Sequence, residues 1–252
     1  MAGRGGDGLP AARAPGLGWA GLGWAGLGWA GLGWAGLGWG QTGGMRTWVK
    51  ICGLSTPETV DAAVEAGADA VGFVLAEGSP RTVDAATVRE LAARVPGHVE
   101  AVGVFRGQGV EHVIELARAS GLTTVQLHGD ESPADVAAAH AAGLRVVRAV
   151  DVATYAAEPE ESRVAFREDL LLIDAVTPGA GAVFDGQPLL DAPPHREWLL
   201  AGGLDPENVA ARVAELRPAG VDVSSGVESS RGVKSVALIR EFVAAARSGD
   251  PA

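Results

Sequence analysis

The one cysteine of this 252-residue chain is the side chain with the most chemical potential. Cys52 ends an apolar run, Trp48–Cys52, and a helix start at Ser55–Glu58 follows at once. In a barrel of parallel strands, chemistry is done at the C-terminal strand ends. A thiol there can act as a base or nucleophile when its pKa is lowered toward neutrality. A lone cysteine is also a common small core residue, and this alternative stays open.

Strand alternation places further polar side chains with Cys52. Residues two apart share a face, so Lys50 and Cys52 both point into the barrel if Ile51 faces outward. The same rule pairs Gln126 with His128, Leu172 with Asp174, and Asp222 with Ser224. In a closed barrel the first and last strands are neighbours, so we expect Lys50 and Asp222 to form a buried ion pair. The ammonium would also favour the thiolate of Cys52.

An acid–base pair is the chemistry that these positions suggest. Cys52 and Asp174 would face each other across the barrel mouth as base and acid. Asp174 follows the apolar run Leu170–Ile173, and its alternative role is that of a helix cap or loop carboxylate. For His128, a hydrogen-bonded structural imidazole competes with a catalytic role.

Two glycine-bearing turns predict an anion site. Ala201–Leu204 and Ser224–Glu228 follow the seventh and eighth strands, where barrels of this kind hold phosphate with backbone N–H groups. A third such loop, Thr177–Asp185, follows the sixth strand. It is a mobile cover, a further amide donor or simply a turn.

The elements that must position these residues alternate regularly after Met45. Strands are expected at Trp48–Cys52, Ala70–Leu75, Glu100–Phe105, Thr124–His128, Leu144–Val150, Leu170–Asp174, Trp198–Ala201 and Gly220–Ser224. Helical patterns lie between them at 57–66, 84–95, 109–119, 133–142, 152–158, 188–192, 206–217 and 234–247. Almost wholly apolar strands suit a covered parallel sheet, and eight units predict a single (β/α)₈ TIM barrel over 45–252. A doubly wound open sheet is the alternative.

Local signals mark the helix ends. Ser132-Pro133 and Asp205-Pro206 read as an N-cap followed by proline at the first helical position, and Ser55 with Glu58 reads as a capping box. Glycines are expected just past three helix ends, where a left-handed residue is favoured: Gly67, Gly121 and Gly143.

The first 44 residues differ from the rest. Residues 16–40 are five copies of Gly-Leu-Gly-Trp-Ala, the last ending in Gly40, and they hold five of the seven tryptophans. This period suits neither helix nor strand, so we expect 1–44 to be a disordered low-complexity extension. It has no unbroken signal-peptide core. Met45 is our expected biological start.

The composition limits the classes of partner that we expect this chain to bind. The net charge is −11, and 1–44 contribute +1, so the remainder carries −12. This acidity argues against nucleic acid or an anionic membrane, but not against a small anion held by backbone amides. One cysteine allows no internal disulfide and fits the cytoplasm, and no apolar run is long enough to span a bilayer. We expect a monomer, with a homodimer as the alternative.

Seven segments together carry a family resemblance. In chain order they are Lys50–Leu54, Gly78–Arg81, Val125–Asp130, Leu172–Asp174, Phe184–Asp185, Leu200–Leu204 and Val221–Glu228. They resemble phosphoribosylanthranilate isomerases of tryptophan biosynthesis. The resemblance implies a (β/α)₈ fold, no cofactor and no metal. The implied reaction is an Amadori rearrangement of the phosphosugar N-(5-phosphoribosyl)anthranilate to 1-(2-carboxyphenylamino)-1-deoxyribulose 5-phosphate.

The resemblance also implies roles for single residues. Cys52 would remove the C2′ proton, Asp174 would protonate the ring oxygen, and Arg81 would meet the anthranilate carboxylate. The turns at Gly202-Gly203 and Ser225-Gly226 would hold the phosphate. The whole expected substrate-binding set is Arg81, Gln126, His128, Gly181, Gly202, Gly203, Asp222, Ser225 and Gly226.

The loop after the sixth strand departs from the family pattern. Pro178–Ala182 and Phe184–Gly186 lack the hydroxyl, the lysine and the tryptophan usual there, which puts the loop's contacts in doubt. Three other functions stay open. The sister isomerase of histidine biosynthesis, or a dual-substrate version of it, would need Asp at the position of Cys52 and a second phosphate site. A non-catalytic phosphate-sugar barrel and a structural protein built on the repeat are the others.

Overall fold

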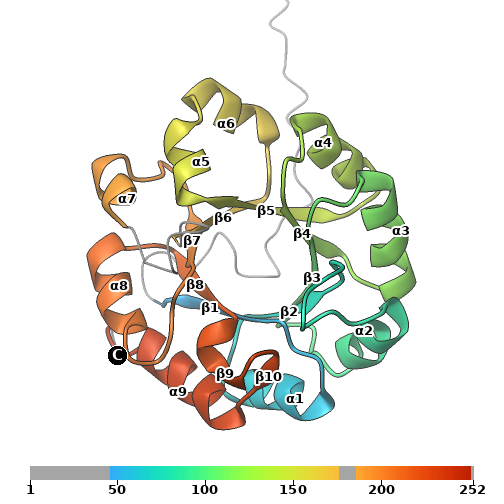
Figure 1. Ribbon diagram of the computed structural model, residues 1–252, viewed down its shortest axis with the longest axis vertical. Helices are drawn as coiled ribbons and strands as arrows, with labels where there is room; N and C mark the ends of the chain where they lie inside the picture. Colours follow the sequence, from blue (N-terminus) through green and yellow to red (C-terminus); the bar gives the residue numbers. More distant parts are fainter. Residues whose placement is uncertain (1–45, 176–185, 251–252) are drawn as a thin grey trace, which may run out of the picture.

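The chain folds into a closed barrel of eight parallel strands. The computed structural model describes residues 46–175 and 186–250. Strand β1 (Trp48–Cys52) pairs with β2 (Ala70–Val74) on one side and with β8 (Gly220–Val223) on the other, so the sheet has no free edge. The view down the barrel shows helices around the outside (Figure 1). Closure confirms the (β/α)₈ prediction and rules out the doubly wound sheet.

The elements follow the predicted order. The other barrel strands are β3 Glu100–Phe105, β4 Thr124–His128, β5 Arg145–Asp151, β6 Leu170–Asp174 and β7 Trp198–Ala201. The helices are α1 Pro57–Glu65, α2 Ala85–Ala92, α3 Val110–Ser120, α4 Pro133–Ala141, α5 Val152–Ala157, α6 Glu160–Phe166, α7 Gln187–Asp191, α8 Val209–Leu216 and α9 Val236–Ala246. The segment after β8 forms the 3₁₀ turn η1 (Ser225–Val227) and a hairpin of β9 (Glu228–Ser230) and β10 (Val233–Lys234).

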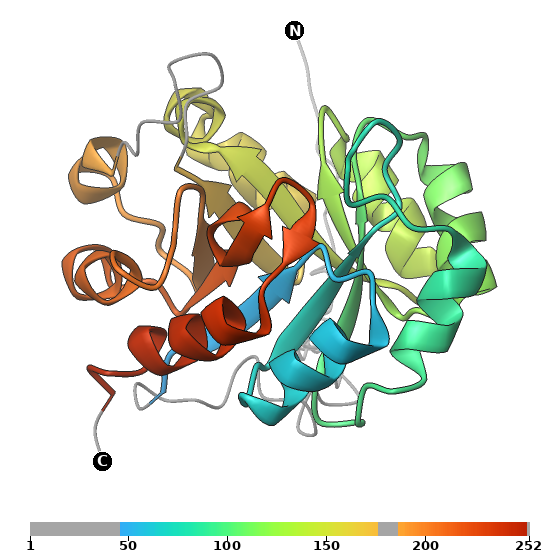
Figure 2. The ribbon, with the colours of Figure 1, turned by 60° about the horizontal axis from the view of Figure 1, so that its bottom comes forward.

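Apolar layers on both faces of the strands hold the barrel together. Residues facing the helices, such as Val49 and Ile51, are fully buried in the larger layer. The smaller layer fills the barrel interior with Trp48, Ala70, Val102, Val147, Ala149, Leu170, Leu172, Leu199 and Ala201. In the rotated view, α9 lies beside α1 along the outside of β1 (Figure 2). Successive residues of a strand therefore face the helices and the barrel interior in turn, as a covered parallel barrel requires.

Some helix starts differ from the prediction. Ser132 caps α4 and Pro133 is its first residue, as predicted, and Asp135 completes a capping box that was not predicted. At α1 the cap is Thr56 and not Ser55, because Pro57 occupies the first helical turn and the residue directly before it must cap. Asp205 accepts from the amides of Glu207 and Asn208, both at 2.9 Å, in a turn that ends before α8 begins.

The three helix-end glycines adopt the left-handed conformation, as predicted. Two elements were not predicted. Helix α6 buries only Phe166, so its sequence carries no apolar period. The β9–β10 hairpin is short and mostly exposed, so it carries no strand pattern. None of the helices within residues 46–175 and 186–250 is long and apolar enough to cross a membrane.

Candidate active site

The C-terminal ends of the strands bring the predicted acid–base residues to one end of the barrel. Cys52, His128 and Asp174 are the last residues of β1, β4 and β6. A Cβ built on Gly72 of β2 would lie 3.0 Å from the Cys52 Sγ and 3.3 Å from the Lys50 Nζ. The two side chains therefore share the face that Gly72 leaves open, as alternation predicts.

The predicted buried ion pair is present. The Lys50 Nζ donates to the Asp222 Oδ1 at 2.7 Å, and the Lys50 side chain is fully buried. Desolvation lowers the pKa of Lys50, but the charges of Asp222 and Cys52 outweigh it and leave the pKa raised. Lys50 is therefore an ammonium group, held by Asp222 directly beneath the thiol.

The pKa of the Cys52 thiol is shifted in the direction that disfavours the thiolate. Burial raises it above its ordinary value of 9.0, and the Asp222 carboxylate adds to this rise. Lys50 and Lys234 lower it but do not compensate. The predicted effect of the ammonium is confirmed, but burial outweighs it because Cys52 is almost completely buried.

His128 and Gln126 line the same side of β4. Burial lowers the pKa of His128 below 6.5, against the opposing effect of Asp174. Its imidazole is therefore neutral at neutral pH. Gln126 is 3% exposed, and its Oε1 has no hydrogen-bond partner among the residues that the structure describes. A buried amide oxygen without a partner is costly and suits an added hydrogen-bond donor.

Asp174 stands in register with Asp151 of β5 and Ala201 of β7. Strand β6 is three places from β1 around the closed barrel. Asp174 and Asp222 both act on the pKa of His128, and Asp222 also acts on that of Cys52. The base and acid candidates thus belong to one electrostatically connected group.

The two glycine-bearing turns lie against each other. Gly202 and Gly203 have φ values of 90° and 62°, which favour glycine. A Cβ on Gly226 of η1 would collide with the Leu204 carbonyl, with the carbonyl carbon at 2.8 Å. Backbone therefore packs on backbone here, and the turns after β7 and β8 form one surface, with Ser225 next to the contact. Gly181, in the third loop, lies outside the described residues.

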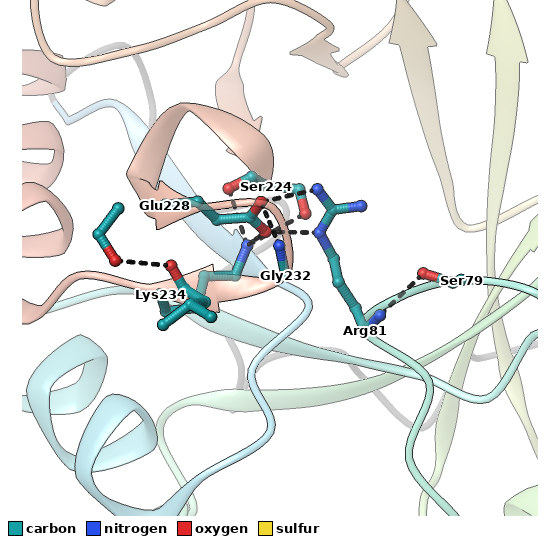
Figure 3. A network of polar contacts seen from close by, with 8 residues as sticks. Ser79, Arg81, Ser224, Glu228, Gly232 and Lys234 are labelled. Carbon is teal, nitrogen blue, oxygen red and sulfur yellow. Dashed lines mark hydrogen bonds and ion pairs between the residues drawn. The ribbon is translucent and has the colours of Figure 1, made fainter.

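Arg81 belongs to a polar network that sequence reasoning did not foresee (Figure 3). Its Nε and Nη2 donate to the two carboxylate oxygens of Glu228 at 2.6 and 2.9 Å. Lys234 donates to the same carboxylate at 2.9 Å and to the Ser224 carbonyl at 2.8 Å. Glu228 closes one of the motifs quoted above, which is the only signal that could have identified it. Lys234 gives no sequence signal.

A cavity of about 760 Å³ lies at the opposite end of the barrel, between Arg46, Trp198 and Pro218. None of the predicted site residues lines it. We place the candidate site at the C-terminal strand ends, where the titratable groups converge. Among residues 46–175 and 186–250, no group of three His, Cys, Asp or Glu side chains is arranged to hold a metal ion.

Comparison with known proteins identifies the family. Residues 49–245 match a sequence-family model described as N-(5'phosphoribosyl)anthranilate (PRA) isomerase. An N-(5'-phosphoribosyl)anthranilate isomerase of Afipia carboxidovorans is 43% identical over 208 residues, covering 79% of this chain and 89% of the relative. The chain belongs to the phosphoribosylanthranilate isomerase family.

Solved structures of the same family share the fold. TrpF from Jonesia denitrificans is 42% identical, with a TM-score of 0.72 over 79% of this chain and 96% of its own. Another phosphoribosylanthranilate isomerase was solved in complex with reduced 1-(o-carboxyphenylamino)-1-deoxyribulose 5-phosphate. It is 34% identical, with a TM-score of 0.67, and the match covers 79% of this chain and 98% of that one.

Proposed function

We propose that this chain isomerises N-(5′-phosphoribosyl)anthranilate to 1-(2-carboxyphenylamino)-1-deoxyribulose 5-phosphate, a step of tryptophan biosynthesis. The observation that carries the proposal is Cys52 at the end of β1, directly above the Lys50–Asp222 pair, in a chain of this family. The reaction is an aldose-to-ketose shift, which needs one acid, one base and an anchor for each of two anions. The site offers a candidate for each.

The acid step would belong to Asp174. It would give a proton to the furanose oxygen as the C1′–O bond breaks, and the anilino nitrogen would supply the electron pair, so that an iminium forms. The base step would belong to Cys52. Its thiolate would remove the C2′ proton, and the C–H electron pair would form the C1′=C2′ bond and neutralise the iminium. The resulting enol would then become the ketone by losing the proton of its C2′ hydroxyl while C1′ gains a proton.

The ammonium of Lys50 stabilises the thiolate that the base step requires. Burial disfavours the thiolate, and Lys50 and Lys234 oppose that effect from nearby. Asp222 keeps Lys50 charged and in place. Asp222 belongs to the expected substrate-binding set. We assign it the role of supporting the base by holding Lys50 in place.

The binding groups would divide the substrate between them. Arg81 would bind the anthranilate carboxylate with the N–H groups that Glu228 does not use. The amides around Gly202-Gly203 and Ser225-Gly226 would hold the phosphate. The Gln126 Oε1 would accept a hydrogen bond from a sugar hydroxyl. The neutral imidazole of His128 would bond to a sugar hydroxyl as donor or as acceptor, because it has one nitrogen of each kind.

The test is loss of anthranilate fluorescence when phosphoribosylanthranilate is added to the full chain. We expect rapid loss of fluorescence with this substrate. The two-phosphate substrate of the histidine-pathway isomerase should not be isomerised. Turnover of the second compound alone would contradict the proposal. Binding without turnover of either would instead indicate a phosphate-sugar binding barrel.

Assembly and location are part of the same proposal. Because every proposed catalytic and binding group comes from a single chain, we propose that a monomer is active. We place the enzyme in the cytoplasm, which fits a biosynthetic family and a lone free cysteine. Light scattering at the assay concentration tests the first point, and a homodimer would contradict it.

A further inference from the structure

We infer that Glu228 is a positioning residue, which fixes the guanidinium of Arg81 relative to Cys52 and to the phosphate turn. The inference rests on the proposed function and deepens it, because it explains how the site measures the distance between the substrate's carboxylate and its phosphate. No role for Glu228 follows from its sequence position alone.

Arg81 lies across the loop that follows Cys52. A Cβ on Gly53 would come within 2.6 Å of the Arg81 Cδ and 3.2 Å of the Ser224 Oγ. Gly53 also has a φ of 77°, so glycine is required there for two reasons. The aliphatic part of Arg81 therefore rests on the peptide next to the proposed base. A thiolate at Cys52 raises the pKa of the Arg81 guanidinium, so the two groups lie within electrostatic reach of each other.

Glu228 holds the far end of Arg81. Its side chain is 4% exposed, and both carboxylate oxygens accept from the guanidinium in a two-point arrangement. The Gly232 amide donates to the Glu228 Oε2 at 2.9 Å, and Lys234 donates to the Oε1 (Figure 3). With two cations and one amide on it, the carboxylate is charged and its orientation is fixed.

The hairpin that carries Glu228 is itself anchored to the Arg81 loop. A Cβ on Gly232 would lie 3.1 Å from the Pro80 carbonyl oxygen, so the hairpin turn touches the residue before Arg81. At its base, Lys234 donates to the Ser224 carbonyl at 2.8 Å. The hairpin therefore spans from β8 to the loop after β2, beside the end of β1.

Ser224–Glu228 links the two proposed anion anchors. Ser225 and Gly226 provide the phosphate turn, and Glu228 follows only two residues later. The position of Arg81 is thus tied to the phosphate turn through one short segment, in which Val227 is fully buried. A substrate must present its carboxylate and phosphate at the matching separation, so the network selects for the length of the substrate.

The test compares phosphoribosylanthranilate with phosphoribosylaniline, which lacks the carboxylate. For Glu228→Gln we expect KM for the carboxylated substrate to rise about tenfold or more, the scale of a lost charge-assisted bond, with kcat changed less. The aniline substrate should change little. Arg81→Met should show the same selectivity, and the double variant should be no worse than Arg81→Met, because Glu228 acts through Arg81.

Glu65→Gln is the matched control, since it removes a carboxylate from an exposed pair with Arg240 and should leave both substrates unaffected. Equal losses on both substrates, or no loss, in Glu228→Gln would overturn the positioning role. If that variant does not fold, Glu228→Asp keeps the charge for Lys234 and should show a smaller loss of the same selectivity; an equal loss on both substrates would again overturn it. A wild-type chain inactive on phosphoribosylanthranilate would contradict the proposed function itself.

Discussion

At the scale of single residues, the thiol of Cys52 is subject to opposing influences. Burial favours the neutral form, while Lys50 and Lys234 favour the thiolate. The proposed base is therefore mostly protonated near neutral pH before substrate binds. Proton removal then depends on the small thiolate fraction, or on a fall in the pKa of Cys52 when substrate binds.

Alkylation of Cys52 should show this directly, because it is the only cysteine in the chain. The pKa is raised above 9.0, so the reaction rate with iodoacetamide should still climb at pH 9 and level off only at higher pH. Free cysteine under the same conditions, with a pKa of about 8.5, is the control. A plateau near pH 7 would show that the ammonium groups outweigh burial.

Glu228 should contribute to stability in a defined acid range. Desolvation raises its pKa, but bonds from Arg81, Gly232 and Lys234 outweigh this and lower it from 4.5 to about 2. A depressed folded-state pKa stabilises the fold above the unfolded value, and this stability is lost as pH falls from 4.5 toward 2. Urea unfolding of wild type and Glu228→Gln should therefore differ more at pH 6 than at pH 3. An equal difference at both would argue against this pKa.

Residue-level prediction succeeded where local alternation decides the outcome. It placed Lys50 with Asp222, and Gln126 with His128, on inward faces. It could not give the net pKa shift of Cys52, because the desolvation of the thiol depends on packing from many segments. Arg81 and Glu228 are 147 residues apart, so no local pattern can report their contact.

At the scale of elements, the turns after β7 and β8 depend on close backbone approach. Gly226→Ala would insert a methyl group into the Leu204 carbonyl, so the turns must separate. We expect a lower melting temperature and a higher KM, since the proposed phosphate amides move. Gly97→Ala is the control, because no atom lies within 4 Å of its added Cβ. Equal behaviour of the two variants would show that the turns are independent.

Two elements escaped prediction because their sequence signal is weak, and the predicted helix over 206–217 begins three residues later, at Val209. The strands matched to within one residue at each end, because their apolar runs are bounded by polar or glycine residues. Helix α6 and the β9–β10 hairpin bury few side chains, and so have no period to detect. The hairpin's importance lies in contacts to Pro80 and Arg81, far away in the sequence.

At the scale of the whole molecule, the barrel joins its own ends. The Asp250 carboxylate accepts from the Thr47 amide at 3.0 Å and from its hydroxyl at 2.7 Å, next to the start of β1. Closure thus relies on residues from Thr47 onward. The repeat in residues 16–40 has no core-forming period.

We therefore expect a variant that lacks residues 1–44 to keep the melting temperature and the kcat of the full chain. Differential scanning calorimetry and the fluorescence assay, run side by side, check this. A fall of several degrees in the variant would mean that the extension stabilises the barrel. Loss of activity at an unchanged melting temperature would give it a functional role.

The central claim is that Cys52 and Asp174 perform the proton transfers. The most direct measurement is kcat for phosphoribosylanthranilate in wild type, Cys52→Ser and Asp174→Asn. Each substitution keeps approximate size but removes the proton acceptor or donor, so each should lower kcat by at least about 10²-fold with KM little changed. The double variant should be little worse than the weaker single variant, because both groups serve one sequence of transfers. Full activity in Cys52→Ser would contradict the claim and leave Cys52 as a core residue.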